Sequence, residues 1–454
     1  MKRLKRFNKS MLQGPILPSV IQYTIPIILT SILQLLFNAA DLVVVGRFCG
    51  SVSVAAVGAT GAVTNLVVNL FMGLSVGAGV SVAHALGSRE NTAVHRTVHT
   101  AIPTAVICGV ALTGIGILLA KPLLEMMGTP ETVLPLSTIY MQVYFGGMTF
   151  NMVYNYCASI LRAAGDTRSP LIFLTISGVI NVVLNVIFVT VFHMNVAGVA
   201  LATTISQAIS AVLVIIALMR RTDACKLELK KMRIYKPQLL KMIRIGLPAG
   251  INGSLFSISN VMIQSSINSF GDVLMSGNAA AANIEGFVYV TINAFHQTAV
   301  NFCGQNAGAK QYDRVKKIMF VCMACAVVVG VCVSGTVYLF GEQLLSIYIT
   351  DSSEAIAHGV VRLTYVMLPY FICGLMDVCN GGLRGMGASF SPMVMSVLGV
   401  CGIRLGWIFT IFQIPRFHTP QCLYSSYMVS WTVTFILLMI AFMVLYRKHT
   451  KNTQ

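Results

Sequence analysis

Apolar runs long enough to cross a lipid bilayer recur from one end of the chain to the other. A helix needs about 20 apolar residues to span the hydrocarbon core, and only helices or closed barrels satisfy their backbone hydrogen bonds in lipid. The sequence therefore predicts an all-α membrane protein with twelve transmembrane helices. We expect them near residues 18–46, 55–83, 97–120, 136–159, 170–192, 196–219, 246–269, 278–304, 318–340, 362–382, 392–414 and 424–446.

Charged residues are few and unevenly placed. Only 10% of the residues are charged, whereas soluble proteins have about 25%. If both termini are cytoplasmic, 26 of the 31 Lys and Arg lie in or beside cytoplasmic segments, as the positive-inside rule requires. We therefore expect an integral multi-pass protein of a prokaryotic cytoplasmic membrane. The net charge of +17 then indicates anionic membrane lipids as partners and not nucleic acid.

The chain repeats itself. The segment LRAAGDTRSP (161–170) returns as LRGMGASFSP (383–392), 222 residues later, and Pro26 and Pro248 have the same separation. Each half holds six spans, an even number, so both halves enter the membrane in the same orientation. This arrangement is typical of transporters that rock two pseudo-symmetric six-helix bundles for alternating access. The expected parts are a cytoplasmic N-terminal segment (1–17), an N-lobe (18–219), a cytoplasmic linker (220–245), a C-lobe (246–446) and a cytoplasmic tail (447–454).

Several motifs resemble multidrug and toxic compound extrusion (MATE) transporters, in that family's order and spacing. They are IPIILTSILQLLFNAADLVVVGRF, SVGAGVSVAHALGSRE, LRAAGDTRSP, NVAGVALATTISQ, CGQNAGAKQYDRV and GLRGMGASFSP, which together cover about residues 13–446. The resemblance implies an antiporter that exports amphipathic, often cationic small molecules, driven by inward flow of H⁺ or Na⁺. It implies no enzyme activity and no cofactor. The loops also lack a phosphate-binding GxxxxGK[ST] motif and an HExxH metal pair.

One carboxylate stands inside the first span. Asp41 lies about five residues before the outer end, and a charged group within a bilayer is usually functional. Asn181, Asn185 and Thr203 lie at a similar depth on other spans, roughly 7–16 Å below the outer ends at about 1.5 Å per residue. Asn181 and Asn185 also share a helical face. A carboxylate, two amides and a hydroxyl are therefore expected to meet in the outer half of the N-lobe.

The resemblance assigns the same four positions to the cation-coupling site of the N-lobe, and Tyr140 can belong to the same network. Their oxygens would suit Na⁺ as metal ligands, while a buried carboxylate would equally suit a proton. Position 185 is Asn where many family members have a second Asp, so the sequence leaves the coupling ion open. In the alternative interpretation, these polar groups only hold the helices together.

Other residues are assigned to the substrate cavity or to a hinge. The cavity is expected to include Glu285, Asp377, Asn65 and Gln34, whose two carboxylates would attract cationic cargo. Asp377 can instead pair with a basic residue near the loop. Pro26 permits a kink fifteen residues before Asp41, so cation binding could bend this helix and expel substrate. Alternatively, Pro26 only shapes packing.

A flippase for lipid-linked saccharides or other lipid precursors is the alternative function, because related families share the two-bundle layout. Its anionic cargo would require Arg or Lys within the spans, where only Arg404 is a candidate. The excess of intramembrane acids therefore favours cationic compounds. A membrane-embedded enzyme is the third and least favoured function. The protein is expected to be a monomer, as is usual for this layout.

Overall fold

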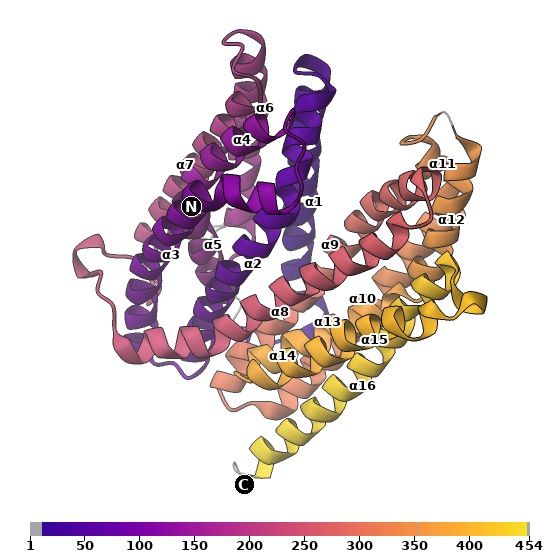
Figure 1. The fold of residues 1–454 in the computed structure, drawn as a ribbon. Helices are drawn as coiled ribbons and strands as arrows, with labels where there is room; N and C mark the ends of the chain where they lie inside the picture. Colours follow the sequence, from indigo (N-terminus) through magenta and orange to yellow (C-terminus); the bar gives the residue numbers. More distant parts are fainter. Residues whose placement is uncertain (1–10, 351, 452–454) are drawn as a thin grey trace. The chain divides into compact units, whose positions relative to one another are not determined.

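The computed structural model describes residues 11–350 and 352–451, apart from the side chains of Ala62 and Val63. Residues 1–10 of the expected N-terminal segment and residues 452–454 of the expected tail therefore lie outside the described residues. Figure 1 shows the fold, in which every regular element of the described chain is a helix. The all-α prediction is confirmed.

The α-helices are connected mostly by short turns. In chain order they are α1 (Ile16–Phe48), α2 (Ser51–Gly87), α3 (Asn91–Met126), α4 (Leu134–Gly146), α5 (Met148–Ala163), α6 (Arg168–Thr190), α7 (Asn195–Met219), α8 (Lys236–Asn268), α9 (Asp272–Gly308), α10 (Tyr312–Leu339), α11 (Gly341–Ser346), α12 (Ser353–Met367), α13 (Tyr370–Gly385), α14 (Phe390–Ser396), α15 (Ile403–Phe409) and α16 (Pro420–Lys451). A π-helix, η3 (Val397–Gly402), joins α14 to α15, and three 3₁₀ turns are η2 (Leu229–Lys231), η4 (Ile411–Gln413) and η5 (Pro415–Phe417).

Length and mean hydropathy alone identify eight helices of the described chain as membrane spans, or nine if the bent pair α12 and α13 is one span. The other three expected spans correspond to α8, α9 and the pair α4 and α5. The helix α9 is less apolar because it carries buried polar residues such as Asn278, Asn301 and Asn306. Inside a bundle such side chains can bond to neighbouring helices, so the twelve-helix layout is consistent with the structure.

Two expected spans are broken within the membrane-spanning length. The span expected at 136–159 divides at Gly147 into α4 and α5. The span expected at 362–382 divides into α12 and α13, which meet at an angle of 46°. Pro369 lies between them, and proline removes a helical N–H and disfavours helix in the preceding residue.

The chain forms two compact units, whose bounds differ from the expected lobes of residues 18–219 and 246–446. In the described chain, the first unit contains residues 11–13 and Ile25–Ser254, and the second contains Gly14–Thr24 and all residues from Leu255. The beginning of α8 therefore belongs with the first unit. Because α8 already begins at Lys236, the last ten residues of the expected linker (220–245) are helical.

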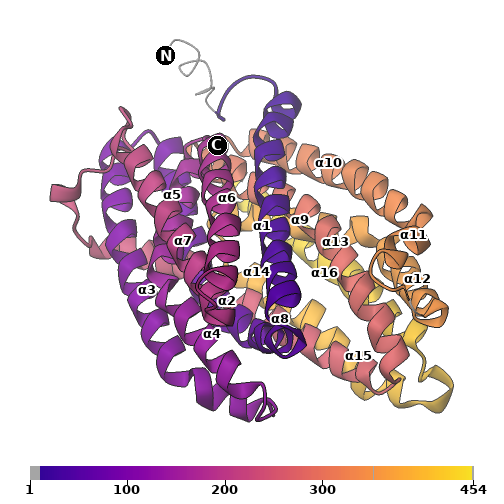
Figure 2. The ribbon, with the colours of Figure 1, turned by 90° about the horizontal axis from the view of Figure 1, so that it is seen from above.

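Within the first unit, glycines explain why the beginning of α8 packs on α2. A Cβ on Gly73 would overlap the backbone of Gly250, and a Cβ on Gly77 would overlap the carbonyl of Met242. Small residues at a crossing let two helix backbones approach closely, which is a common way of packing helices in membranes. The helices α6 and α7 also pack side by side in this unit, as Figure 2 shows.

Within the second unit, α9 is central. It packs against α10, α12 and α13, and α13 also packs against α16. The first turns of α1 join this unit because Tyr23 contacts Phe302 edge to face at 5.2 Å and Thr24 bonds the hydroxyl of Thr298 at 2.8 Å.

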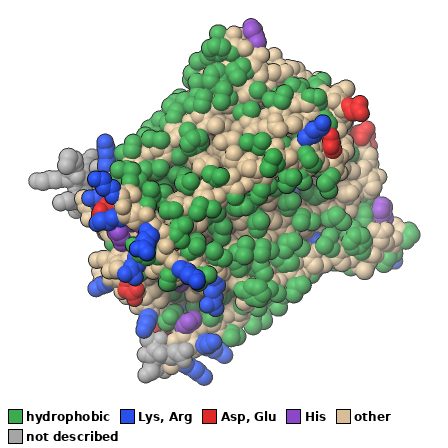
Figure 3. Space-filling model, turned by 60° about the vertical axis from the view of Figure 1, so that its left-hand side comes forward, with side chains coloured by type: hydrophobic (Ala, Val, Ile, Leu, Met, Phe, Trp, Pro, Cys, Tyr) green, Lys and Arg blue, Asp and Glu red, His purple; other side chains and the backbone are tan. Residues whose placement is uncertain are grey.

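Hydrophobic side chains cover much of the surface. On the face in Figure 3 they are spread broadly among other side chains and backbone, and the charged side chains lie mainly near the margins. Large apolar side chains such as Leu118, Val186 and Val444 are exposed along the helices. An exposed apolar surface of this extent is suited to contact with lipid.

Candidate functional site

Asp41 is held by side chains from two other helices of the first unit. Asn185 on α6 donates a hydrogen bond from Nδ2 to Asp41 Oδ1 at 2.5 Å. Thr203 on α7 lies 3.5 Å from Asp41 Oδ2 through its hydroxyl oxygen. The carboxylate is half-buried, and no Lys, Arg or His of the described residues lies within ion-pair distance of it.

The two asparagines extend this cluster. Asn181 donates to the Thr203 hydroxyl at 3.3 Å, and Asn185 also donates to Asn181 Oδ1 at 3.3 Å. Asn181 is 5% exposed and Asn185 is fully buried, so their amides depend on these internal partners. The structure therefore brings together the four residues that the sequence placed at one depth. Their role in coupling stays a prediction.

Local packing explains why α1 comes close enough to α6 for these contacts. One turn before the polar residues, a Cβ on Gly178 would overlap the ring of Phe37, so the absence of a side chain on α6 admits that ring. On the other side, Val45 and Val189 belong to one buried apolar cluster. Asp41 is thus fixed between apolar contacts above and below it along the helix.

Tyr140 lies beside the cluster without completing it. Its ring packs on that apolar cluster and stacks on Tyr144, with centroids 6.1 Å apart. Both tyrosines are within electrostatic range of Asp41, but the Tyr140 hydroxyl makes no hydrogen bond to Asp41 in the described structure. A direct role for Tyr140 in binding the cation stays a prediction.

The donor set at Asp41 suits a cation. Carboxylate, amide and hydroxyl oxygens are the ligands that hard cations prefer. Asn185 Oδ1 is buried and has no hydrogen-bond partner among the described residues, so an oxygen beside Asp41 is available to a cation or an acidic proton. The residues therefore fit Na⁺ and H⁺, and the geometry does not choose between them.

Glu285 differs from expectation, because its charge is compensated. Arg362 Nη2 lies 2.5 Å from Glu285 Oε2, and the two side chains are 7% and 16% exposed. The Tyr370 hydroxyl lies 3.5 Å from Oε1 of the same carboxylate. The charge that was expected to attract cationic cargo is therefore compensated by a buried counter-ion. The cavity role of Glu285 stays a prediction.

This ion pair belongs to a larger network that the sequence did not predict. Arg362 Nη1 donates to Asn278 Oδ1 at 2.5 Å, and the same oxygen accepts from the Tyr424 hydroxyl at 3.1 Å. Asn278 and Glu285 are seven residues apart on α9, two helical turns, so they share a face. This seven-residue spacing is the sequence signal that could have indicated a polar network on α9.

Three arginines of the second unit are buried. Arg362, Arg384 and Arg404 are 6%, 7% and 3% exposed, and among them only Arg404 was considered from the sequence as a candidate within a span. Arg404 lies over the ring of Tyr427, 4.1 Å from its centroid, and donates to the Ser430 hydroxyl at 3.1 Å. The guanidinium is thus stabilised by an aromatic face and a hydroxyl.

Asp377 faces a different environment from Glu285. It interacts electrostatically with Arg384 on the same helix, which is the basic residue near the loop that the sequence allowed as its partner. The two form no ion pair within the distance criterion among the described residues, and Asp377 Oδ2 is buried without a hydrogen-bond partner. His296 on α9 bonds the backbone carbonyl of Asp377 at 2.7 Å. A cavity role for Asp377 stays a prediction.

The remaining predicted residues lie outside these clusters. Gln34 and Asn65 are exposed in the first unit, and neither forms part of the Asp41 cluster. Pro26 is buried inside α1, which continues through it, and its carbonyl accepts a hydrogen bond from the Thr30 hydroxyl at 2.7 Å. The cavity and hinge roles of these residues stay predictions.

Known proteins identify the family. A model of the MatE family matches residues 26–187 and again residues 248–410, and the two matches start 222 residues apart, which confirms the internal repeat. The Bacillus subtilis "Probable multidrug resistance protein YpnP" is 25% identical over 392 residues, 86% of this chain and 87% of its own. The Staphylococcus aureus "Multidrug export protein MepA" is 24% identical over 295 residues, 64% of this chain and 65% of its own.

Solved structures show the same fold. The crystal structure of MATE in the bent conformation has a TM-score of 0.89 at 19% identity and covers 98% of both chains. A MOP superfamily transporter from Pyrococcus furiosus has a TM-score of 0.90 at 19% identity and covers 97% of this chain and 98% of its own. The protein therefore belongs to the MatE family, whose members are multi-pass membrane transporters and not enzymes.

Proposed function

We propose that the protein is a secondary active antiporter that exports amphipathic, cationic drugs or metabolites in exchange for inward-moving H⁺ or Na⁺. It works as a monomer in a prokaryotic cytoplasmic membrane, with both termini in the cytoplasm and without a cofactor. Alternating access of the two pseudo-symmetric bundles moves the substrate outward. The basic residues of the expected cytoplasmic segments support this orientation.

The observation that carries the proposal is the environment of Asp41. A carboxylate on a membrane-spanning helix has amide and hydroxyl partners and no basic counter-ion among the described residues. Placing a charge in a bilayer is costly, by about 2.5–3.5 kcal/mol on an insertion scale. An incoming H⁺ or Na⁺ would remove this cost by neutralising the carboxylate. Cation binding would thereby change the free energy of the bundle's conformations.

Asn185 offers a way for the cluster to respond to the cation. Its Nδ2 now donates to both Asp41 and Asn181, which suits an ionised carboxylate. Rotation of the amide would turn Oδ1, now without a partner, toward Asp41. That oxygen could then bind Na⁺ or accept a hydrogen bond from a protonated carboxyl, so the cluster would have one arrangement for each state of Asp41.

Substrate attraction would depend mainly on the first unit. In the second unit, Glu285 is neutralised by Arg362, and Arg404 adds a positive charge. Asp41, unlike Glu285, has no basic side chain of the described chain within ion-pair distance, so its charge remains available to attract a cation. The names of YpnP and MepA support multidrug export as the substrate class. The comparisons do not favour the flippase alternative, although three buried arginines weaken the argument from charge against it.

The proposal is tested by efflux of a fluorescent cation from inverted vesicles under separately imposed H⁺ and Na⁺ gradients. Wild-type protein should pump under at least one gradient, and the Asp41→Asn variant should fall to the background of empty vesicles. Asp272→Asn, which makes the same chemical change at an exposed position, should retain wild-type pumping. Undiminished pumping by Asp41→Asn, or gradient-independent pumping by the wild type, would refute the proposal.

A further inference from the structure

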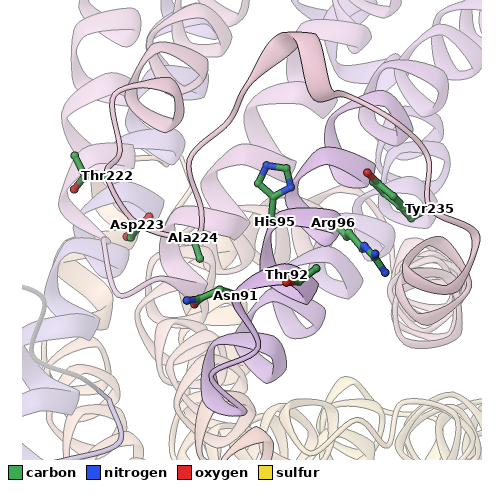
Figure 4. Close-up of a pocket in the computed structure, with 8 residues that line it drawn as sticks. All are labelled: Asn91, Thr92, His95, Arg96, Thr222, Asp223, Ala224 and Tyr235. Carbon is green, nitrogen blue, oxygen red and sulfur yellow. The ribbon is translucent and has the colours of Figure 1, made fainter.

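A groove lies in the first unit between the beginning of α3 and the segment that joins α7 to α8. Its volume is about 740 Å³, within the range of roughly 300–1,000 Å³ that small-molecule sites occupy. Figure 4 shows Asn91, Thr92, His95 and Arg96 of α3 in the middle, with Tyr235 beside Arg96 and with Thr222, Asp223 and Ala224 on the opposite side. None of these residues belongs to the Asp41 cluster.

The groove is held in shape by hydrogen bonds between α3 and the joining segment. The backbone N–H of Glu228 donates to His99 Nε2 at 3.0 Å, while His99 Nδ1 bonds the carbonyl of His95 at 2.8 Å. Farther along, the N–H of Tyr235 donates to the hydroxyl of Thr100 at 3.1 Å. These bonds fix the segment at two points along α3, so the groove does not require a ligand to form.

Arg96 is the positive group of this groove. Its guanidinium lies over the ring of Tyr235, 5.5 Å from the centroid, which orients the side chain. No carboxylate of the described residues lies within ion-pair distance of Arg96. A guanidinium has five N–H donors in a planar fork that matches the oxygens of a phosphate, so this group can accept an anionic ligand.

Asp223, the acid that lines the groove, does not repel an anion, because its charge is neutralised by a neighbouring arginine. Asp223 is bound by the guanidinium of Arg221, and its Oδ1 also accepts from the backbone N–H of Cys225 at 3.1 Å. Burial raises the pKa of Asp223, but the hydrogen bonds and the positive charge of Arg221, together with backbone N–H donors, outweigh burial and hold that pKa below its usual value. Asp223 is thus an ionised but neutralised partner of Arg221, and Arg96 keeps its charge uncompensated.

The level of the groove along α3 indicates which anion reaches it. The apolar run of this helix is expected to begin at residue 97, directly after Arg96. Residues 91–96 therefore extend about 9 Å beyond the hydrocarbon boundary at about 1.5 Å per residue, which is the layer of the lipid headgroups. We propose that the groove is a binding site for a phosphate ester, supplied by the headgroup of an anionic membrane phospholipid.

The site is tested with the purified full chain in nonionic detergent, by native mass spectrometry during titration with short-chain phosphatidylglycerol or phosphatidylcholine. The wild type should retain one phosphatidylglycerol saturably and in preference to phosphatidylcholine. Arg96→Gln should weaken that binding about tenfold, the effect of losing one charge-assisted hydrogen-bond partner. Tyr235→Leu should weaken it about threefold, because Arg96 loses the ring that orients it.

Lys230→Gln is the matched control, since it removes one positive charge from an exposed position on the same segment outside the groove. It should leave phosphatidylglycerol binding unchanged, and all variants should unfold at the wild-type temperature. An equal loss in Lys230→Gln and Arg96→Gln would show general charge attraction and overturn the site. Unchanged binding in Arg96→Gln would do the same, and tighter binding of inorganic phosphate than of phosphatidylglycerol would overturn the lipid as the ligand.

Discussion

Substitution of Arg362 by Met should destabilise the protein strongly, because it leaves Glu285 buried without its counter-ion. The two charged groups are 2.5 Å apart, and their side chains are 7% and 16% exposed. Removal of one partner from a buried ion pair typically costs about 3–5 kcal/mol, since the remaining charge loses its compensation in a poorly solvated site. Asn278 would lose one donor but keep the hydroxyl of Tyr424, so the unpaired carboxylate dominates the cost.

The double variant Arg362→Met with Glu285→Met separates the charge effect from the packing effect. Replacing both partners of a buried pair by apolar side chains is often neutral or even stabilising. We therefore expect the double variant to be more stable than Arg362→Met by at least about 2 kcal/mol. Unfolding can be followed by tryptophan fluorescence, because Trp431 packs edge to face on Tyr370, 5.3 Å away, next to Glu285.

Lys121→Met supplies the control for this prediction. Lys121 and Glu125 form an exposed pair at 3.8 Å, with side chains 64% and 52% exposed. Surface pairs of this kind contribute about 0–1 kcal/mol, so the free energy of unfolding should change little. A compensated ion pair is refuted if Arg362→Met costs no more than Lys121→Met. It is also refuted if the double variant loses as much stability as Arg362→Met and Glu285→Met lose together when each is made alone.

Two further predictions test other parts of the structure. Gly250→Ala should lower the free energy of unfolding by about 1–3 kcal/mol because its Cβ would overlap the carbonyl oxygen of Leu70. Gly61→Ala, with no atom within 4 Å of its Cβ, should leave stability unchanged or raised, and equal effects would contradict the proposed helix crossing. Asn185→Asp places a second carboxylate beside Asp41 and should lower the H⁺ or Na⁺ concentration for half-maximal efflux about tenfold, whereas an unchanged concentration would contradict cation binding there.

The Asp41 cluster could be predicted because regular helices convert sequence position into depth. With about 1.5 Å per residue and a known direction for each span, Asn181, Asn185 and Thr203 had to lie near the level of Asp41. The i,i+4 spacing then placed both amides on one face. The structure connects all four residues through hydrogen bonds of 2.5–3.5 Å.

The pairing of Glu285 with Arg362 could not be derived in this way. The sequence assigned Arg362 to the outer edge of an unbroken span, but that span bends by 46° at Pro369. A break in a helix changes the depth of the residues around it and the direction in which their side chains point. Their positions can therefore not be calculated from the number of residues to the end of the span. The partners are also 77 residues apart and on different helices, a separation for which local periodicity carries no signal.

The bounds of the two compact units could also not be predicted from the sequence repeat. Pro26 and Pro248 showed that α1 and α8 are equivalent, but not that each would pack partly outside its own repeat. That result depends on shape complementarity, such as the glycine contact between Gly73 and Gly250. A repeat in sequence identifies related helices, whereas packing decides which of them form one compact body.

The central claim is that substrate export and cation entry are one coupled process that requires Asp41. The most direct measurement uses proteoliposomes without an imposed ion gradient, in which a gradient of cationic substrate is the only driving force. Wild-type protein should then move H⁺ or Na⁺ in the direction opposite to the substrate, and Asp41→Asn should abolish this counter-movement. Substrate-driven ion movement that persists in Asp41→Asn, or substrate flux in the wild type without any opposing ion movement, would contradict the account.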